Sequence, residues 1–208
     1  MKRSFCCLAV LAAVVVLPAF ADIVQNGTFQ PGPGLNLSFA TVTGNTIPGW
    51  TVTQGSVDWI GTYWQQPPHG GYSVDLDGYF AAGEISQDIQ TTVGQWYVLS
   101  FWLAGNPDGP PETKTLKVTT GDMSQNFTYL TPPATHDKMG WTQNSISFQA
   151  TSATTSIKFT SLDDAGNAFG PVLGDVSVSV PEGSFYSYSA FALGLSGLLM
   201  LVRRKRQA

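Results

Sequence analysis

Ser145-Ile146-Ser147-Phe148-Gln149-Ala150 and Val176-Ser177-Val178-Ser179-Val180 are two stretches in which polar and apolar side chains alternate residue by residue. Successive side chains of a β-strand point to opposite faces of the sheet, so each stretch can bury one face and leave the other in water. The alternation therefore predicts a sheet that covers a hydrophobic core on one side.

Other β-type runs recur along the chain, with turn residues between them. The predicted strands are Tyr72–Leu76, Ile85–Ile89, Trp96–Leu103, Leu116–Thr120, Asn126–Leu130, Ser145–Ala150, Thr155–Ser161 and Val172–Val180. Pro48-Gly49, Asn106-Pro107 and three Pro-Pro pairs punctuate the intervals, as turns require. Many short antiparallel strands predict an all-β sandwich. Trp96–Leu103 is apolar on both faces, which predicts a central strand covered on both sides.

The first 21 residues have the pattern of a cleaved secretory signal. Lys2 and Arg3 precede an apolar stretch, Phe5–Leu17, that is too short to span a bilayer comfortably, and Ala19-Phe20-Ala21 is the small-x-small pattern of a cleavage site. We predict a signal peptide over 1–21 and a mature chain that starts at Asp22. The mature chain contains no cysteine, so the exported domain must be stabilised by its own core.

The other end of the chain predicts a membrane anchor. The run Phe185–Val202 is mostly apolar and is followed by the basic cluster Arg203–Arg206. Eighteen helical residues span about 27 Å, close to the hydrocarbon thickness of a bilayer. We predict a transmembrane helix over 185–202 within a C-terminal segment 181–208. The basic tail favours the cytoplasmic side, which leaves the domain 22–180 on the outside.

The predicted domain is acidic. Four lysines and all fourteen acidic residues of the chain lie between Asp22 and Glu182, so this part carries a net charge of −10. Nucleic-acid binding needs clustered positive charge, so nucleic acid is excluded as a partner. Surface solubility is the ordinary explanation of the acidity.

Several segments, in this order along the chain, resemble the choice-of-anchor C family, which is similar to domain of unknown function 642 of bacterial surface proteins and plant cell-wall proteins. They include Asn26-Gly27-Thr28-Phe29, Ile47-Pro48-Gly49-Trp50, Val57–Trp64, Ser73–Gly78, Leu103–Pro110, Met139-Gly140-Trp141 and Gly170–Val176. The resemblance covers nearly all of Asp22–Val180. It implies a galactose-binding-domain-like jelly-roll β-sandwich, a fold shared with many carbohydrate-binding modules, and it implies no enzyme activity.

The C-terminal segment resembles a second family. Val180-Pro181-Glu182-Gly183, an apolar helix and a basic tail are similar to PEP-CTERM sorting signals of Gram-negative bacteria. That resemblance implies an exosortase-type processing enzyme as a partner. Gly183 stands where these signals usually have a second proline. The alternative is a plain single-span anchor that is never cut.

A loop rich in aromatic and amide side chains is the first candidate binding site. Tyr63, Trp64 and Gln65 follow Trp59 in a stretch that also contains glycines and prolines. Aromatic faces next to amide donors suit sugars, whose C–H faces pack on rings and whose hydroxyls need partners. The alternative is that Trp59 and one of Tyr63 or Trp64 cap the core. Of the three, Trp64 is the one that we expect to be an exposed platform.

A second candidate surface is the connection Asn106–Thr113, which carries Asn106, Asp108 and Glu112. Asn and Asp side chains suit hydrogen bonds to vicinal hydroxyls, but they are equally common turn formers that bond to their own backbone. His136 and Trp141 are candidates for the same rim. Asp75 and Asp77 lie two residues apart and most simply start a turn.

A structural calcium ion is implied by related carbohydrate-binding sandwiches, in which the first and last strands supply carboxylates. This chain has Gln30 where a glutamate is usual and Gly174-Asp175 where paired acids are usual. Calcium takes six to eight oxygen ligands and gains affinity from charged ones. We therefore expect weak or absent binding, with Asp175 as the main remaining ligand.

Motifs of catalysis are missing from the sequence. It has no Gly-x-Ser-x-Gly elbow, no His-Glu-x-x-His and no cysteine nucleophile in the mature chain. The sequence predicts an exported, non-catalytic domain that binds polysaccharide, either an exopolysaccharide or a cell-wall glycan, without a required cofactor. The alternative is a structural matrix or adhesion protein that has no small ligand.

Overall fold

The computed structural model describes residues 22–32, 36–79, 81–163 and 166–181. The predicted signal peptide, 1–21, and the predicted transmembrane helix, 185–202, lie outside the described residues. Within the described ranges, no helix has the length and hydropathy needed to cross a bilayer.

The described chain is built from strands. They are β1 (Phe39–Gly44), β2 (Thr51–Ile60), β3 (Ser73–Asp75), β4 (Asp77–Gly78), β5 (Ala81–Ala82), β6 (Glu84–Gln90), β7 (Trp96–Gly105), β8 (Thr113–Thr120), β9 (Met123–Leu130), β10 (Thr142–Gln149), β11 (Thr154–Ser161) and β12 (Pro171–Ser179). All eight predicted strands are present, with ends that differ by up to three residues. The long strands β1 and β2 were not predicted.

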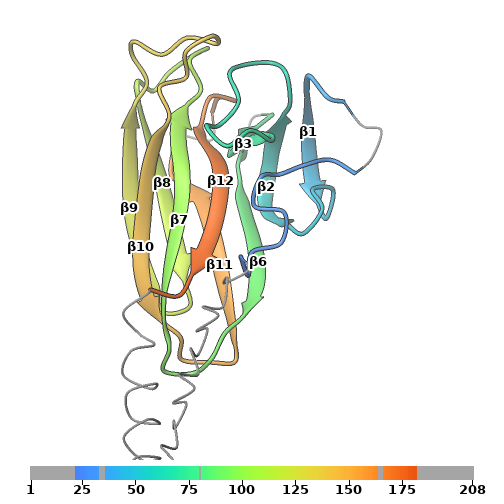
Figure 1. The fold of residues 1–208 in the computed structure, drawn as a ribbon. Coiled ribbons are helices and arrows are strands. Elements are labelled where there is room, and N and C mark those ends of the chain that lie inside the picture. Colours follow the sequence, from blue (N-terminus) through green and yellow to red (C-terminus); the bar gives the residue numbers. More distant parts are fainter. Residues whose placement is uncertain (1–21, 33–35, 80, 164–165, 182–208) are drawn as a thin grey trace, which may run out of the picture.

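The strands form a sandwich whose main sheet has the order β10-β7-β12-β3-β2-β6-β11-β8-β9, with β1 on the free side of β2. The prediction of an all-β sandwich is confirmed. In Figure 1, β10, β7 and β12 lie side by side in front, and β8 and β11 lie behind them. β2 joins the two layers, because Thr51–Gln54 pairs with β6 and Asp58–Ile60 pairs with β3.

The core lies between these layers and is rich in aromatic rings. Phe101 of β7 packs edge-on against Phe159 of β11, at 5.4 Å between ring centroids, and against Phe127 of β9, at 5.1 Å. The alternation predicted for β10 is confirmed, because Ile146 and Phe148 are buried whereas the serines beside them are not. Each fully buried aromatic or aliphatic side chain contributes about 1.5–3 kcal/mol.

Trp59 belongs to this core, in agreement with the alternative prediction that Trp59 caps the core and does not bind a ligand. Its ring is buried, and its indole Nε1 donates a hydrogen bond to the Phe29 carbonyl oxygen at 2.8 Å. A buried indole N–H needs such a partner. The bond ties the N-terminal segment to the sandwich.

The N-terminal segment 22–30 lies against β12 because one glycine permits a close approach. A Cβ atom at Gly27 would lie 1.8 Å from the Val176 carbonyl oxygen, so any larger residue would force the two chains apart. The Val176 N–H donates to the Gly27 carbonyl oxygen at 2.9 Å. Asn26 has a left-handed φ of 50° and caps the turn by accepting the Gln30 N–H at 2.7 Å. The segment thus builds a wall beside β12.

The outward face of β7 differs from the prediction. β7 is central in hydrogen bonding, since it pairs with β10 and β12. Its outward side chains, however, are not covered: Trp96 is 48% exposed, and Val98, Ser100 and Trp102 are half-buried. The expectation of a strand covered on both sides is wrong, because the outward apolar residues face open surface and not a second layer.

Candidate functional site

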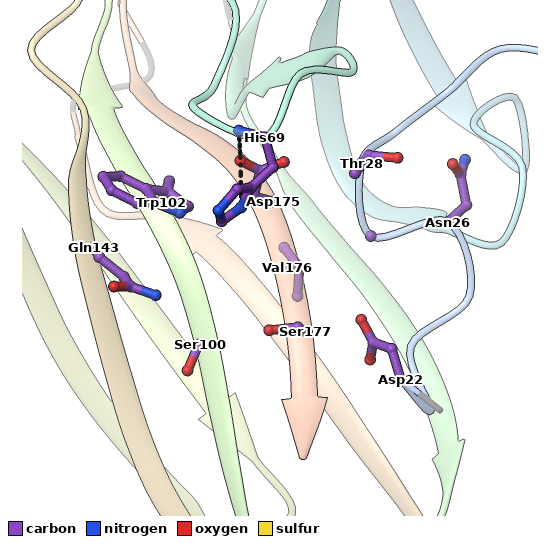
Figure 2. Close-up of a pocket in the computed structure, with 11 residues that line it drawn as sticks. Asp22, Asn26, Thr28, His69, Ser100, Trp102, Gln143, Asp175, Val176 and Ser177 are labelled. Atoms are coloured by element: carbon purple, nitrogen blue, oxygen red, sulfur yellow. Dashed lines mark hydrogen bonds and ion pairs between the residues drawn. The ribbon is translucent and has the colours of Figure 1, made fainter. Parts of the chain in front are cut away.

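A groove of about 370 Å³ lies on the outward face of β7, β10 and β12. One wall is the N-terminal segment and another is the loop that carries His69 (Figure 2). The groove offers a ring, hydroxyls, amides and carboxylates at once. Its lining residues are Asp22, Asn26, Gly27, Thr28, His69, Ser100, Trp102, Gln143, Asp175, Val176 and Ser177.

Trp102 provides the apolar surface of the groove. Its indole is half-buried and meets the His69 imidazole edge-on, at 6.1 Å between ring centroids and 82° between planes. Pairing in the sheet sets Gln143 beside Trp102, and it sets Ser100 directly opposite Ser177. A flat ring therefore lies next to small hydroxyl groups and an amide, which leaves open space above the sheet.

The carboxylate of Asp175 forms the back of the groove. Asp175 has a left-handed φ of 47° at an irregularity in β12, where the pairing with β7 shifts between Gly174 and Ser177. Its Oδ2 accepts a hydrogen bond from the main-chain N–H of His69 at 3.0 Å. The same oxygen lies 3.4 Å from the ring nitrogen Nδ1 of His69, and the dashed lines in Figure 2 mark both interactions. Burial raises the pKa of Asp175, and the bond from His69 opposes that shift.

Asp22 holds the opposite wall in place. Its Oδ1 accepts two backbone N–H groups, from Val24 and from Val178, each at 3.0 Å. The first bond turns the chain locally, and the second fastens the N-terminal segment to β12. One oxygen of this carboxylate is therefore used in structure, whereas the residue as a whole is exposed.

A second candidate site lies at one end of the sandwich, and we call it the loop cluster: Tyr63, Asp108 and His136 from loops and Phe39 from the start of β1. The Tyr63 hydroxyl donates to Asp108 Oδ2 at 3.1 Å, and His136 Nε2 lies 2.6 Å from Asp108 Oδ1. The Tyr63 ring lies 4.7 Å from His136 and 5.2 Å from Phe39. Burial, with the Asp108 carboxylate, raises the pKa of Tyr63. The structure thus brings predicted Tyr63 and Asp108 together.

The polar atoms of the loop cluster are already paired with one another. Both Asp108 oxygens already have a partner in the cluster, so a sugar hydroxyl would have to share them with Tyr63 and His136. Phe39 is 52% exposed and Tyr63 is 38% exposed. The cluster presents ring surface but few free donors or acceptors, in contrast to the groove.

Trp64 is not exposed as predicted, whereas the ligand-binding role of the exposed Gln65 stays a prediction. Trp64 is 5% exposed, and its Nε1 donates to the Ser73 hydroxyl at 3.0 Å, so the expectation of an exposed platform is wrong. Gln65 Oε1 accepts the Met139 N–H at 2.8 Å, and the Gln65 N–H donates to the His136 carbonyl oxygen at 2.7 Å. These bonds hold the loop that carries His136 in position.

Asn106 is a turn former, as one of its predicted alternatives required. It is 6% exposed, and its Oδ1 accepts the Asp108 N–H at 2.9 Å. Its Nδ2 donates to the buried Asp75 Oδ2 at 2.6 Å. The turn predicted at Asp75 and Asp77 is confirmed, since the Asp77 N–H donates to Asp75 Oδ1 at 3.0 Å. Asn106 therefore supports the loop that carries Asp108 and does not face a ligand.

Behind Asn106 lies a cluster of charges, Asp75, Asp77, Lys114 and Asp163, each of which is buried. The Lys114 ammonium donates to the carbonyl oxygens of Gly109 at 2.9 Å and Phe169 at 2.5 Å. Burial raises the pKa of all three carboxyls, that of Asp75 well above its usual range and that of Asp77 to about 6. Burial also lowers the pKa of Lys114, against the pull of the carboxylates.

Asp77 makes the stability of the domain depend on pH. A carboxyl whose pKa is raised from 3.8 to about 6 stabilises the fold fully below pH 3.8, and this contribution is lost as the pH rises through 6. From pH 5 to pH 8, the wild type should lose about 1.4 kcal/mol through this group. In Asp77→Asn that part of the loss should be absent when unfolding is followed in urea at both pH values.

Asp88→Asn, at an exposed carboxylate on β6, is the matched control and should keep the wild-type pH dependence. An Asp77→Asn protein whose free energy of unfolding changes with pH as the wild type's does would contradict the role of Asp77.

The predicted metal ligands separate in the structure. Asp175 lies in the groove, and its buried Oδ1 accepts no hydrogen bond within the described residues. Gln30 is exposed, its main chain is paired with Asn26, and it does not line the groove. Among the residues with described positions, no group of three or more His, Cys, Asp or Glu side chains is arranged to hold a metal ion. Weak calcium binding at Asp175 stays a prediction.

The whole sandwich is similar to known proteins. Residues 22–179 match the family described as "Protein of unknown function (DUF642)". Halomucin of Haloquadratum walsbyi is 28% identical over 165 residues, which is 76% of this chain, but the chain spans only 2% of the length of that relative.

Solved structures of similar shape include TmCBM61 in complex with β-1,4-galactotriose, which is 13% identical with a TM-score of 0.46 and covers 78% of this chain and 100% of its own. A family 35 carbohydrate-binding module from Clostridium thermocellum is 14% identical with a TM-score of 0.44 and covers 70% of this chain and 100% of its own. An arabinose-bound α-L-arabinofuranosidase, MgGH51, is 14% identical with a TM-score of 0.47 and covers 77% of this chain and 26% of its own.

Proposed function

The chain belongs to the DUF642 family, and from this premise we propose that residues 22–180 form an exported, non-catalytic domain that binds carbohydrate. The ligand is an exopolysaccharide or a cell-wall glycan. The groove on β7, β10 and β12 is its binding site, and the observation that carries the proposal is the half-buried Trp102 ring among hydroxyl, amide and carboxylate groups. Sugars need this combination, because an apolar face and several hydroxyls must be bound together.

The charges of the groove favour a neutral sugar. Asp22 and Asp175 line it, and its lining contains no lysine or arginine. Residues 22–180 as a whole carry a net charge of −9. Uronic acids and sulfated sugars would be repelled by these carboxylates, since no lysine or arginine in the lining compensates their charge. We therefore propose neutral polysaccharide as the ligand class.

The two carboxylates of the groove each bind main-chain N–H groups, which favours binding over glycoside hydrolysis. That reaction needs a proton donor and a second carboxylate free to act as base or nucleophile. Asp22 Oδ1 accepts two backbone N–H groups, and Asp175 Oδ2 accepts one. These bonds give both groups a structural role, which supports binding without turnover.

Outside the described residues, the proposal keeps the predicted export and anchoring. The sequence of 181–208 supports a membrane helix at 185–202 and a PEP-CTERM-like signal open to an exosortase-type enzyme. We also keep, as part of this proposal, the resemblance of residues 22–180 to the choice-of-anchor C family. Membrane or surface attachment would hold the groove where extracellular polysaccharide is found.

Retention on immobilised polysaccharides tests the function. The purified chain should be retained on at least one neutral polysaccharide from a panel of glucans, galactans, xylans and mannans, and it should pass through pectate and alginate columns. Reducing sugar should not be released during the incubation. A chain retained on none of the neutral columns would contradict the proposal, and release of sugar would make the domain an enzyme.

The second candidate function is a structural matrix or adhesion protein without a small ligand. The exposed rings of Phe39 and Tyr63 in the loop cluster favour it, because paired polar groups and free ring surface suit contact with another protein. This candidate predicts that no polysaccharide column retains the chain.

A further inference from the structure

One end of the sandwich contains two turns that are hydrogen-bonded to each other, and the β8–β9 turn, which carries the exposed Asp122, lies beside them. The turn between β6 and β7 and the turn between β10 and β11 exchange backbone bonds, from the Gly94 N–H to the Ala150 carbonyl oxygen at 2.7 Å and from the Ala150 N–H to the Gln95 carbonyl oxygen at 2.9 Å. Both turns lie at the lower end of the domain in Figure 1. We call residues 90–96 and 149–154 the neutral end.

The neutral end contains no charged residue, although the domain 22–180 carries a net charge of −9. It exposes large apolar side chains instead: Val93 is 63% exposed and Trp96 is 48% exposed. The polar groups around them are threonine, serine and glutamine side chains. An uncharged surface that carries a tryptophan is the composition found where proteins meet the headgroup region of a bilayer.

The chain leaves the sandwich beside this surface. Ser179, at the end of β12, pairs with Val98 of β7, two residues from Trp96. From Pro181 to Phe185, where the apolar run begins, four residue steps reach at most about 14 Å. A membrane helix that starts at Phe185 therefore keeps the end of β12, and the neutral end next to it, close to the lipid surface.

The opposite end is not suited to that contact. Phe39 and Tyr63 are exposed there, but charged and titratable groups stand among the loops, including Asp108 and His136 of the loop cluster. Its loops carry Glu112, Asp137 and Lys138 as well. Charged groups lose hydration when they approach lipid, so the two ends differ in the cost of contact.

We propose that the neutral end of the sandwich rests on the lipid surface, with Val93 and Trp96 in the headgroup region, while the tail is anchored. This inference rests on the proposed membrane helix and not on the carbohydrate groove. It fixes the orientation of the domain, because the loop cluster then points away from the membrane and the groove lies along its side.

Quenching of tryptophan fluorescence by lipid tests the inference. The full chain is reconstituted into phosphatidylcholine and phosphatidylglycerol vesicles that contain a lipid with a nitroxide on its headgroup. Trp50, Trp59 and Trp64 are buried, and Trp102 and Trp141 are half-buried. Trp96 is therefore the most exposed of the six tryptophans. Wild-type fluorescence should be quenched, and Trp96→Phe should lose most of the quenching. Trp102→Phe, which changes the half-buried groove tryptophan, is the matched control and should be quenched as the wild type is.

Two results would overturn the inference, and they are distinguishable. If the chain sediments with the vesicles but Trp96→Phe is quenched as strongly as the wild type, the domain contacts lipid elsewhere or not at all. If the chain does not associate with vesicles, the anchor itself is wrong and the orientation falls with it. Neither result bears on retention by polysaccharide columns, which tests the groove separately.

Discussion

Trp102→Ala should lower the affinity for neutral polysaccharide at least about tenfold, a loss of about 1.4 kcal/mol of binding free energy. Trp102 supplies the ring of the groove, and its removal leaves hydroxyl and amide groups without an apolar face on which a sugar can pack. The side chain is half-buried and faces away from the core, so the melting temperature should change little. Affinity electrophoresis in gels that contain the retaining polysaccharide measures the change.

Two matched variants locate this effect. Trp102→Phe keeps a ring at the same place and should recover much of the affinity. Tyr63→Ala removes the exposed ring of the loop cluster and should bind as the wild type does. Loss of affinity in Tyr63→Ala, with wild-type binding by Trp102→Ala, would move the site from the groove to the loop cluster.

Lys114→Met should cost about 3–5 kcal/mol of stability at pH 8. Methionine has a similar length but no charge. It would leave the buried carboxylates near Lys114 without their cation and the carbonyl oxygens of Gly109 and Phe169 without a donor. The loss should be smaller at pH 5, where Asp77 takes up a proton.

Urea unfolding followed by circular dichroism measures the loss of stability in Lys114→Met. Lys117→Met is the matched control, because Lys117 is on the same strand and is only half-buried, and it should change stability by less than about 0.5 kcal/mol. Equal stability of Lys114→Met and the wild type at pH 8 would show that the ammonium does not compensate the buried carboxylates.

The strands that follow a strict period of two were predictable, and those that break it were not. Ser145–Ala150 alternates without interruption and folds as predicted. β2 was missed because Gly55, with a φ of 57°, and an irregularity between Val52 and Gln54 interrupt its alternation. A residue inserted into a strand shifts every later side chain to the other face, so the pattern cannot be read from the sequence.

The candidate site was predicted only in part, for a related reason. Apolar residues on both faces of β7 indicated a covered strand, but Trp102 on the outward face is the ring of an open groove. Period two says which side chains share a face and not whether that face is covered. Trp64 looked exposed beside Gln65-Gln66, yet a single hydrogen bond to Ser73 and the packing around it bury the ring. Such long-range contacts leave no local pattern.

Tyr63 and Asp108 were predicted on two separate surfaces, yet the structure brings them together although 45 residues separate them. Both lie in connections at the same end of a sandwich, and loops at one end of antiparallel strands converge whatever their sequence separation. His69 and the walls of the groove had no such signal. The His69 main chain is held by Asp175, and the wall formed by the N-terminal segment depends on the close approach of Gly27 to Val176.

The central claim is that a neutral polysaccharide binds in the groove of β7, β10 and β12. Its most direct test is an NMR titration of the labelled chain with oligosaccharides cut from the retaining polysaccharide, following the indole N–H of Trp102 and the side-chain amide of Gln143. We predict that these resonances and the backbone amides of Val176 and Ser177 shift during the titration, and that all of the shift changes fit one common dissociation constant. Shifts confined to the loops of Tyr63 and His136, with the groove resonances unmoved at saturation, would contradict it.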